Sequence, residues 1–248
     1  MMYIVEIPVT FPKGQTGHVS MGSVFHGALM ELVGTEAAAR FHEESLRPYR
    51  QCLLPKPGNQ AVWQFGILTE GAFHTIMEAL QRQQSIYLRQ KRWTIAMGKP
   101  RVLWQAAEKD LMEKHLDGAI PTGGQINYLT PVGFKQQGQY VLLPDSRLVL
   151  QSALARWNAL AAEPLEDGIA DVLGYYTQLR RYRIQSQVFG VEKQYIPGCV
   201  GTMSFAFLGD EMVRRTTALL WDFACVSGLG IKTALGMGTV MTKIHYKE

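Results

Sequence analysis

His26 is the side chain in this sequence best suited to proton transfer. It lies near the start of a predicted helix, in the segment SVFHGALMEL. An imidazole titrates near pH ~6.5, so it can both accept and donate a proton. The amino end of a helix also attracts anions such as phosphate. Phe25 and Leu29 are apolar neighbours, so a buried histidine that only packs in the core is the competing interpretation.

The segment VSGLGIKTALGMGTVM, near the carboxyl end, combines dense glycines with one lysine. Its glycines and the polar residues between them are Gly228, Gly230, Lys232, Thr233, Gly236 and Gly238. Glycines permit left-handed dihedrals and close approach of another backbone, and the lysine favours a phosphate as ligand. A helix precedes the segment and a strand follows it, an order that suits a backbone cradle for a polyanion. A glycine-rich turn with no ligand is equally compatible with the pattern.

Several other kinds of site are excluded or disfavoured. Lys232 follows Ile231, so the Gly-Lys-Ser/Thr end of a nucleotide P-loop is missing. A dinucleotide fingerprint needs a strand before its glycines, and a helix precedes them here. The sequence has no Gly-x-Ser-x-Gly elbow and no carboxylate cluster at metal-ligand spacing. We therefore expect neither a metal nor a cofactor.

Basic and aromatic residues alternate in two segments, RQKRW at 89–93 and YYTQLRRYR at 175–183. Arginine and lysine bind phosphates, and aromatic faces stack on unpaired bases. The cations that we assign to RNA binding here are Lys91, Arg92, Arg180, Arg181 and Arg183. An ordinary strand pair with one solvated face is the alternative for either segment.

Composition supports a folded chain with a mildly basic surface. Of 248 residues, 47% are apolar and 19% are charged, and the net charge of +4 is compatible with a nucleic-acid partner. Three widely spaced cysteines favour a reducing compartment. No signal peptide and no membrane span is visible, so we expect a cytoplasmic protein without a membrane partner.

Hydrophobic periodicity predicts the positions of the strands and helices. In the first half we expect strands at Met2–Thr10, Pro48–Leu54, Ala61–Leu68, Ser85–Leu88 and Trp93–Met97, and helices at Val24–Ala39 and Glu70–Gln83. We expect Gly34 to weaken or interrupt the first of these helices. In the second half we expect strands at Ile126–Phe134, Arg180–Val188, Thr202–Leu208 and Thr239–Tyr246, and helices at Leu148–Ala161 and Asp210–Val226. Pro131 places its strand at a sheet edge, and Asp117–Gly124 is a turn-rich break.

This order predicts an α+β fold of two tandem ferredoxin-like, RRM-like domains with βαββαβ topology. In each domain a four-stranded antiparallel sheet carries helices on one face. We place the domains at residues 1–118 and 119–248, with Ala106–Leu116 as a connecting helix or linker.

Four segments in sequence order resemble the CRISPR repeat-RNA processing endoribonucleases, the "Cas six" family of RAMP proteins. FHGALMELV resembles the family's first helix, which carries its catalytic histidine, and WQFGILTEGAFHTIMEAL resembles the following strand and helix. NYLTPVGFKQQGQYVLLPDSRLVLQSALARWNAL is the most specific match, and SGLGIKTALGMGTV looks like the family's glycine loop.

The resemblance implies a metal-independent endoribonuclease that binds the repeat hairpin of CRISPR transcripts and cuts once per repeat. The 2′-hydroxyl upstream of the scissile phosphate would attack it, leaving 2′,3′-cyclic phosphate and 5′-hydroxyl ends. His26 would be the general base or acid, and the glycine loop would lie against the RNA backbone. Other subunits of a CRISPR interference complex are possible partners, and the protein would be a monomer or a homodimer.

The sequence departs from the family at the second catalytic group, because many members place a tyrosine or lysine near the histidine. Between Gly14 and Ala39 there is neither. We select His42 first and Lys56 second as partners of His26. The remaining candidates are Lys13, Tyr49 and Arg50.

Two other functions remain open at this stage. The first is a non-catalytic subunit that holds guide RNA in an interference complex. The second is a general RNA-binding protein with two sheet domains and no preference for a CRISPR repeat.

Overall fold

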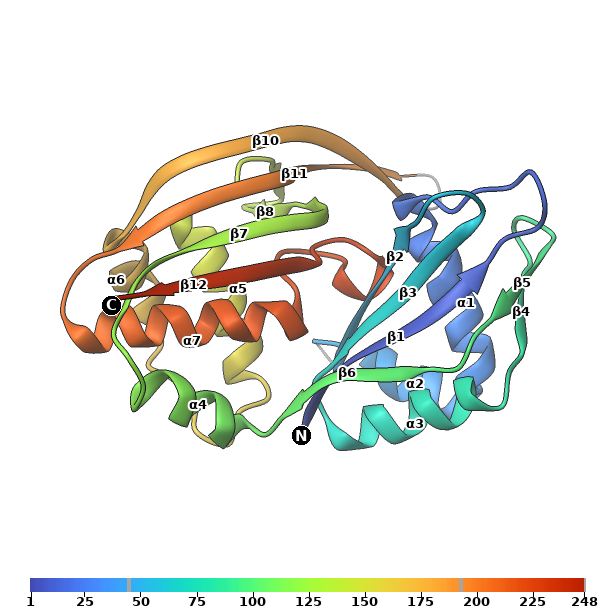
Figure 1. Ribbon diagram of the computed structural model, residues 1–248, viewed down its shortest axis with the longest axis horizontal. Helices are drawn as coiled ribbons and strands as arrows, with labels where there is room; N and C mark the ends of the chain where they lie inside the picture. Colours follow the sequence, from blue (N-terminus) through green and yellow to red (C-terminus); the bar gives the residue numbers. More distant parts are fainter. Residues whose placement is uncertain (44–45, 192–193, 248) are drawn as a thin grey trace.

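The computed structural model describes residues 1–43, 46–191 and 194–247, and the side chains of residues 42 and 43 lie outside that description. Two antiparallel sheets lie side by side, with helices packed on each (Figure 1). This confirms the predicted α+β architecture of two tandem ferredoxin-like units. No helix among the described residues is long and apolar enough to cross a membrane.

The amino-terminal sheet contains six strands rather than the predicted four. Its strands are β1 (Met2–Thr10), β2 (Tyr49–Pro55), β3 (Gln60–Ile67), β4 (Ser85–Leu88), β5 (Trp93–Met97) and β6 (Arg101–Ala106). Their order is β2-β3-β1-β5-β4, and β6 also pairs with β1. Sequence analysis missed β6 because its residues, RVLWQA, show no alternation of apolar and polar side chains.

Three helices accompany this sheet: α1 (Gly22–Val33), α2 (Thr35–Glu43) and α3 (Glu70–Gln81). Sequence analysis expected a helix over Val24–Ala39 that Gly34 weakens or interrupts. The chain forms two helices there, because Gly34 ends α1 with a φ of 82°. Phe25 and Leu29 of α1 are fully buried in the amino-terminal core, which fixes the rotation of this helix.

The carboxy-terminal sheet has the order β10-β11-β7-β12. Its strands are β7 (Pro121–Val132), β10 (Thr177–Val191), β11 (Gln194–Phe207) and β12 (Val240–Tyr246), and β8 (Phe134–Gln136) and β9 (Gln139–Val141) form a separate hairpin. The helices of this half are α4 (Glu108–Leu116), α5 (Ser146–Asn158), α6 (Ile169–Tyr175) and α7 (Glu211–Ser227). Trp157, Trp221 and Phe223 are almost completely buried where α5 and α7 meet the sheet.

Two predictions about β7 are wrong. Pro131 was expected at a sheet edge, but β7 lies between β11 and β12. Proline fits there because the pairing of β7 with β11 shifts register near Pro131, whose carbonyl accepts a hydrogen bond from the Gly238 amide. The expected break at Asp117–Gly124 is also wrong from Pro121 onward, where β7 begins.

The long β10–β11 hairpin extends from the carboxy-terminal sheet toward β2 and the start of α1 (Figure 1). Near its end, Phe189 joins Ile196 and Met237 in a small separate core. Leu111 lies before the predicted domain boundary at residue 118, but it belongs to α4 and packs in the carboxy-terminal core. The boundary itself stays a prediction.

Candidate functional site

His26 projects from the first turns of α1 into the space beside β2. Its side chain is 7% exposed. Nδ1 of His26 and the hydroxyl of Tyr49 share a hydrogen bond of 3.2 Å, in which the donor depends on the imidazole tautomer. The two rings are nearly parallel, with an angle of 25° between their planes. A buried histidine was the competing interpretation of the sequence, and the burial found here agrees with it.

Tyr49 is the first residue of β2 and is fully buried. Burial raises the pKa of its hydroxyl above the ordinary value, so Tyr49 stays protonated at neutral pH. A hydrogen bond donated by Tyr49 places the proton of a neutral imidazole on Nε2, and the reverse bond places it on Nδ1. The second tautomer presents the Nε2 lone pair, as a general base requires, whereas a general acid requires the imidazolium, whose Nδ1–H donates to Tyr49. Tyr49 can therefore fix the tautomer of His26.

Of the two predicted partners of His26, one lies in a turn beside it and the other lies far from it. His42 lies in the last turn of α2, and its side chain is outside the described residues. Its neighbour Phe41 packs edge-on against Tyr49, with 5.2 Å between ring centres, so this turn lies beside the His26 pair. Lys56 is exposed beyond the far end of β2. Seven residues of strand at about 3.3 Å each place it about 23 Å from Tyr49, so the predicted pairing of Lys56 with His26 is not supported.

The glycine loop lies against the start of α1. A Cβ on Gly22 would lie 2.4 Å from the carbonyl oxygen of Leu235, and a Cβ on Gly236 would lie 2.9 Å from the Gly22 Cα. Only glycine permits this approach of two backbones. The loop thus reaches the helix that carries His26, a juxtaposition that sequence analysis did not predict.

The loop's glycines adopt the left-handed backbone that their type permits. Their φ values are 73° at Gly228, 73° at Gly230, 113° at Gly236 and 69° at Gly238. These glycines and Thr233 are buried or half-buried, whereas Lys232 is exposed. Lys232 has a φ of 57°, which is uncommon outside glycine, so the backbone turns at an exposed cation. Most of the loop therefore packs against protein, and Lys232 is its accessible charge.

Two side chains of β2 hold the end of α7 and the loop in place. Arg50 donates hydrogen bonds to the Cys225 carbonyl oxygen from Nε at 3.1 Å and from Nη2 at 2.6 Å. Gln51 donates from Nε2 to the carbonyl oxygens of Gly22 at 2.8 Å and Ala234 at 2.9 Å. Both side chains are almost completely buried. The signal for them was present in the sequence, as two polar residues inside the otherwise apolar segment YRQCLL.

Arg180, Arg181 and Arg183 are exposed on β10, one of the two edge strands of the carboxy-terminal sheet. None of the three forms a salt bridge with another residue in the described part of the chain. The same strand continues to Phe189, on which Gly236 of the glycine loop packs. One hairpin thus connects these arginines to the glycine loop.

Lys91 and Arg92 lie apart from this group, in the turn between β4 and β5. The turn belongs to the edge of the amino-terminal sheet opposite β2. Four strand spacings of about 4.8 Å separate these edges by about 19 Å. Lys91 Nζ lies 6.0 Å from the ring centre of Trp93. The structure therefore places these two cations in a separate basic patch.

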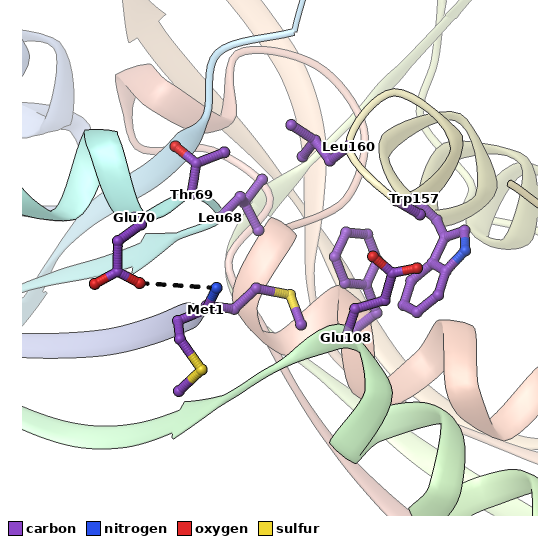
Figure 2. A pocket seen from close by; sticks show the side chains of 10 residues that line it. Met1, Leu68, Thr69, Glu70, Glu108, Trp157 and Leu160 are labelled. Carbon is purple, nitrogen blue, oxygen red and sulfur yellow. Dashed lines mark ion pairs between the residues drawn. The ribbon is translucent and has the colours of Figure 1, made fainter. Parts of the chain in front are cut away.

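A pocket of about 230 Å³ lies at the junction of the two halves (Figure 2). The Met1 amine lies 3.8 Å from Glu70 on one side, and Trp157 and Glu108 line the other. None of the predicted catalytic or RNA-binding residues lines this pocket. Among the residues whose side chains are described, no group of three or more histidines, cysteines or acids is arranged to hold a metal ion.

Comparison with known proteins points to one family. Residues 126–240 match the family model described as CRISPR-associated endoribonuclease Cas6. A CRISPR-associated endoribonuclease Cas6 from Streptococcus thermophilus is 28% identical over 218 residues, which cover 87% of this chain and 88% of that protein. The Mycobacterium tuberculosis protein of the same name is 29% identical over 242 residues, covering 95% of this chain and 76% of that protein.

Solved structures of Cas6 proteins have the same fold as this chain. A product complex of Thermus thermophilus Cas6 superposes with a TM-score of 0.81 at 22% identity, covering 98% of this chain and 100% of that one.

Proposed function

We propose that this chain is an endoribonuclease of the Cas6 family, and that it cuts CRISPR repeat RNA by metal-independent transesterification with His26 transferring a proton. The observation that carries the assignment of His26 is its place in α1, hydrogen-bonded to Tyr49 and one turn from the helix end on which the glycine loop packs.

The reaction needs two proton transfers. The ribose 2′-hydroxyl loses a proton as it attacks the adjacent phosphate, and the 5′-oxygen gains one as it leaves. Imidazole suits either transfer at neutral pH. We assign one to His26 and the other to His42, whose helix turn lies beside Tyr49. Tyr49 is a positioning residue, because it contacts His26 and fixes the proton on one ring nitrogen.

The RNA would approach along β10 and the glycine loop. Arg180, Arg181 and Arg183 are exposed along one strand, and Lys232 is exposed at the turn of the loop. In this arrangement the buried glycines shape the loop and the exposed Lys232 meets a phosphate. Lys91 and Arg92 would contact a more distant part of the transcript.

A substrate lacking the nucleophile tests the chemistry. Repeat RNA with a single 2′-deoxy nucleotide upstream of the cut should bind with unchanged affinity and remain uncut in EDTA. The all-ribose RNA should yield 2′,3′-cyclic phosphate and 5′-hydroxyl ends by mass spectrometry. Cleavage of the deoxy substrate, or products with 5′-phosphates, would contradict attack by the 2′-hydroxyl.

The burial of His26 favours one second candidate, a non-catalytic subunit that holds guide RNA. This candidate predicts tight binding of repeat RNA without product in EDTA or in magnesium. The same assay therefore separates the two functions.

A further inference from the structure

An apolar pocket of about 300 Å³ opens between β10 and the chain that leads into α5. The residues that line it are Leu143, Pro144, Asp145, Ser146, Leu179, Tyr182, Met203 and Phe205. It lies on the helix side of the carboxy-terminal sheet, because Phe205 also packs edge-on against Trp221 of α7. None of the residues assigned to catalysis lines it.

An irregularity in β10 creates one wall of this pocket. Leu179 lies opposite Phe205 and Tyr182 lies opposite Met203, so the pairing skips one residue, Arg180. In a regular strand, residues three apart point to opposite faces of the sheet. The bulge at Arg180 turns Leu179 and Tyr182 to the same face, where both line the pocket. Bulges of this kind often orient side chains beside functional sites.

The wall is accessible and aromatic. The Tyr182 side chain is 66% exposed, and Leu143 on the facing segment is 60% exposed. An exposed aromatic ring over an apolar floor of Met203 and Phe205 offers a flat stacking surface. The volume is at the lower end of the range for ligand pockets, which suits a single nucleobase.

The charge around the pocket identifies the class of ligand. Arg181 and Arg183 lie on either side of Tyr182 in β10 and pair with Ser204 and Thr202, so they point to the other face of the sheet. Neither they nor Arg180 at the bulge form a salt bridge within the described residues. Because β10 is an edge strand, an RNA strand that crosses it could place one base in the pocket and its neighbouring phosphates on these arginines. Asp145 lines the opposite side, and its Oδ1 accepts a hydrogen bond from the Leu148 amide at 2.7 Å, whereas its Oδ2 accepts none from the described residues. Its second oxygen can accept from the exocyclic amine of a base.

We infer that this pocket binds one unpaired nucleobase of the RNA, stacked on Tyr182, with the neighbouring phosphates on the β10 arginines. The inference rests on the proposed function, since the ligand is part of the RNA that the protein processes.

Binding of labelled repeat RNA, measured by fluorescence anisotropy, tests the inference. Tyr182→Ala should weaken binding by about 5- to 150-fold, the range seen when a base loses its aromatic partner. Tyr182→Phe should bind normally. Tyr87→Ala, at an exposed tyrosine on β4, is the matched control and should also bind normally.

A panel of RNAs, each with one abasic position among the unpaired nucleotides, locates the base. At one position, removal of the base should weaken binding to the wild type as much as the Tyr182→Ala substitution weakens binding of the intact RNA. The Tyr182→Ala variant should bind this abasic RNA and the intact RNA with the same affinity.

Unchanged binding of intact RNA by Tyr182→Ala overturns the inference, as does an equal loss with every abasic RNA. Saturable binding of adenosine monophosphate that depends on Tyr182, with RNA binding unaffected, also overturns it. Failure of the wild type to bind repeat RNA at all would instead reject the proposed function.

Discussion

The hydroxyl of Tyr49 and Nδ1 of His26 lie 3.2 Å apart in the amino-terminal core, and this contact joins β2 to the helix that carries the candidate catalytic group. Tyr49→Phe removes the hydroxyl and little else. We expect the cleavage rate to fall about tenfold, equivalent to about 1.4 kcal/mol in the activation free energy, with unchanged RNA affinity.

Because burial raises the pKa of Tyr49, the hydroxyl stays protonated throughout a pH 5–9 assay. The substitution should therefore lower the rate at every pH without removing an ionisation from the pH–rate profile. Tyr3→Phe is the control, since Tyr3 donates its hydroxyl to Glu70 instead. An equal loss in both variants would show a general effect on folding rather than a role at His26.

Substitution by alanine at two glycines of α1 should change the stability of the protein in opposite directions. Gly22→Ala forces a Cβ to within 2.4 Å of the Leu235 carbonyl, so it should separate the glycine loop from α1 and weaken both cleavage and stability. Gly27 is exposed and a Cβ there meets nothing within 4 Å. Gly27→Ala should stabilise the protein by about 0.5–1 kcal/mol, because alanine favours a helix interior. Urea unfolding measures both, and similar behaviour of the two variants would contradict the packing described.

Arg50 should matter for stability far more than an exposed arginine. Arg50→Met leaves the Cys225 carbonyl and Gln64 Oε1 without the donors that they have now. Both bonds are part-buried, so each acceptor that loses its donor should cost about 1–2 kcal/mol, and the free energy of unfolding should fall by about 2–4 kcal/mol. Arg82→Met, at an exposed residue on the surface, should change it by less than about 0.5 kcal/mol. A small effect at Arg50 would mean that the two halves do not depend on this link.

Lys232 should contribute to RNA binding through charge alone. Lys232→Ala should weaken binding of all RNAs similarly, and the slope of log affinity against log salt should decrease by about 1. Lys109→Ala removes an exposed lysine of α4 that pairs with Glu113, and its slope should match the wild type. An unchanged slope for Lys232→Ala would remove the loop's cation from the interface.

Local signals were enough to predict most elements, and their limits have physical causes. Ser85–Leu88 and Trp93–Met97 match β4 and β5 residue for residue, because short alternating segments flank a charged turn. The position of β7 inside its sheet was not predictable from Pro131, since a register shift in the partner strand makes room for proline there. Such compensation depends on contacts between distant segments.

The site shows the same limit. The sequence marked His26 and Lys232 as separate motifs, but nothing local indicates that Gly22 and Gly236 bring them together. Tyr49 was only one of several candidates near His26, because a hydrogen bond across 23 residues depends on how β2 packs against α1. Lys56 was the second choice as partner of His26, and an extended strand carries it away from His26.

Cleavage of repeat RNA by His26→Ala in EDTA tests the central claim most directly, followed on a denaturing gel beside the wild type. The account predicts that the wild type cuts once per repeat without metal. The variant should bind the RNA with the same affinity and cut about 10²–10⁴-fold more slowly, the usual contribution of a proton-transfer group. Cleavage by His26→Ala at the wild-type rate would contradict it.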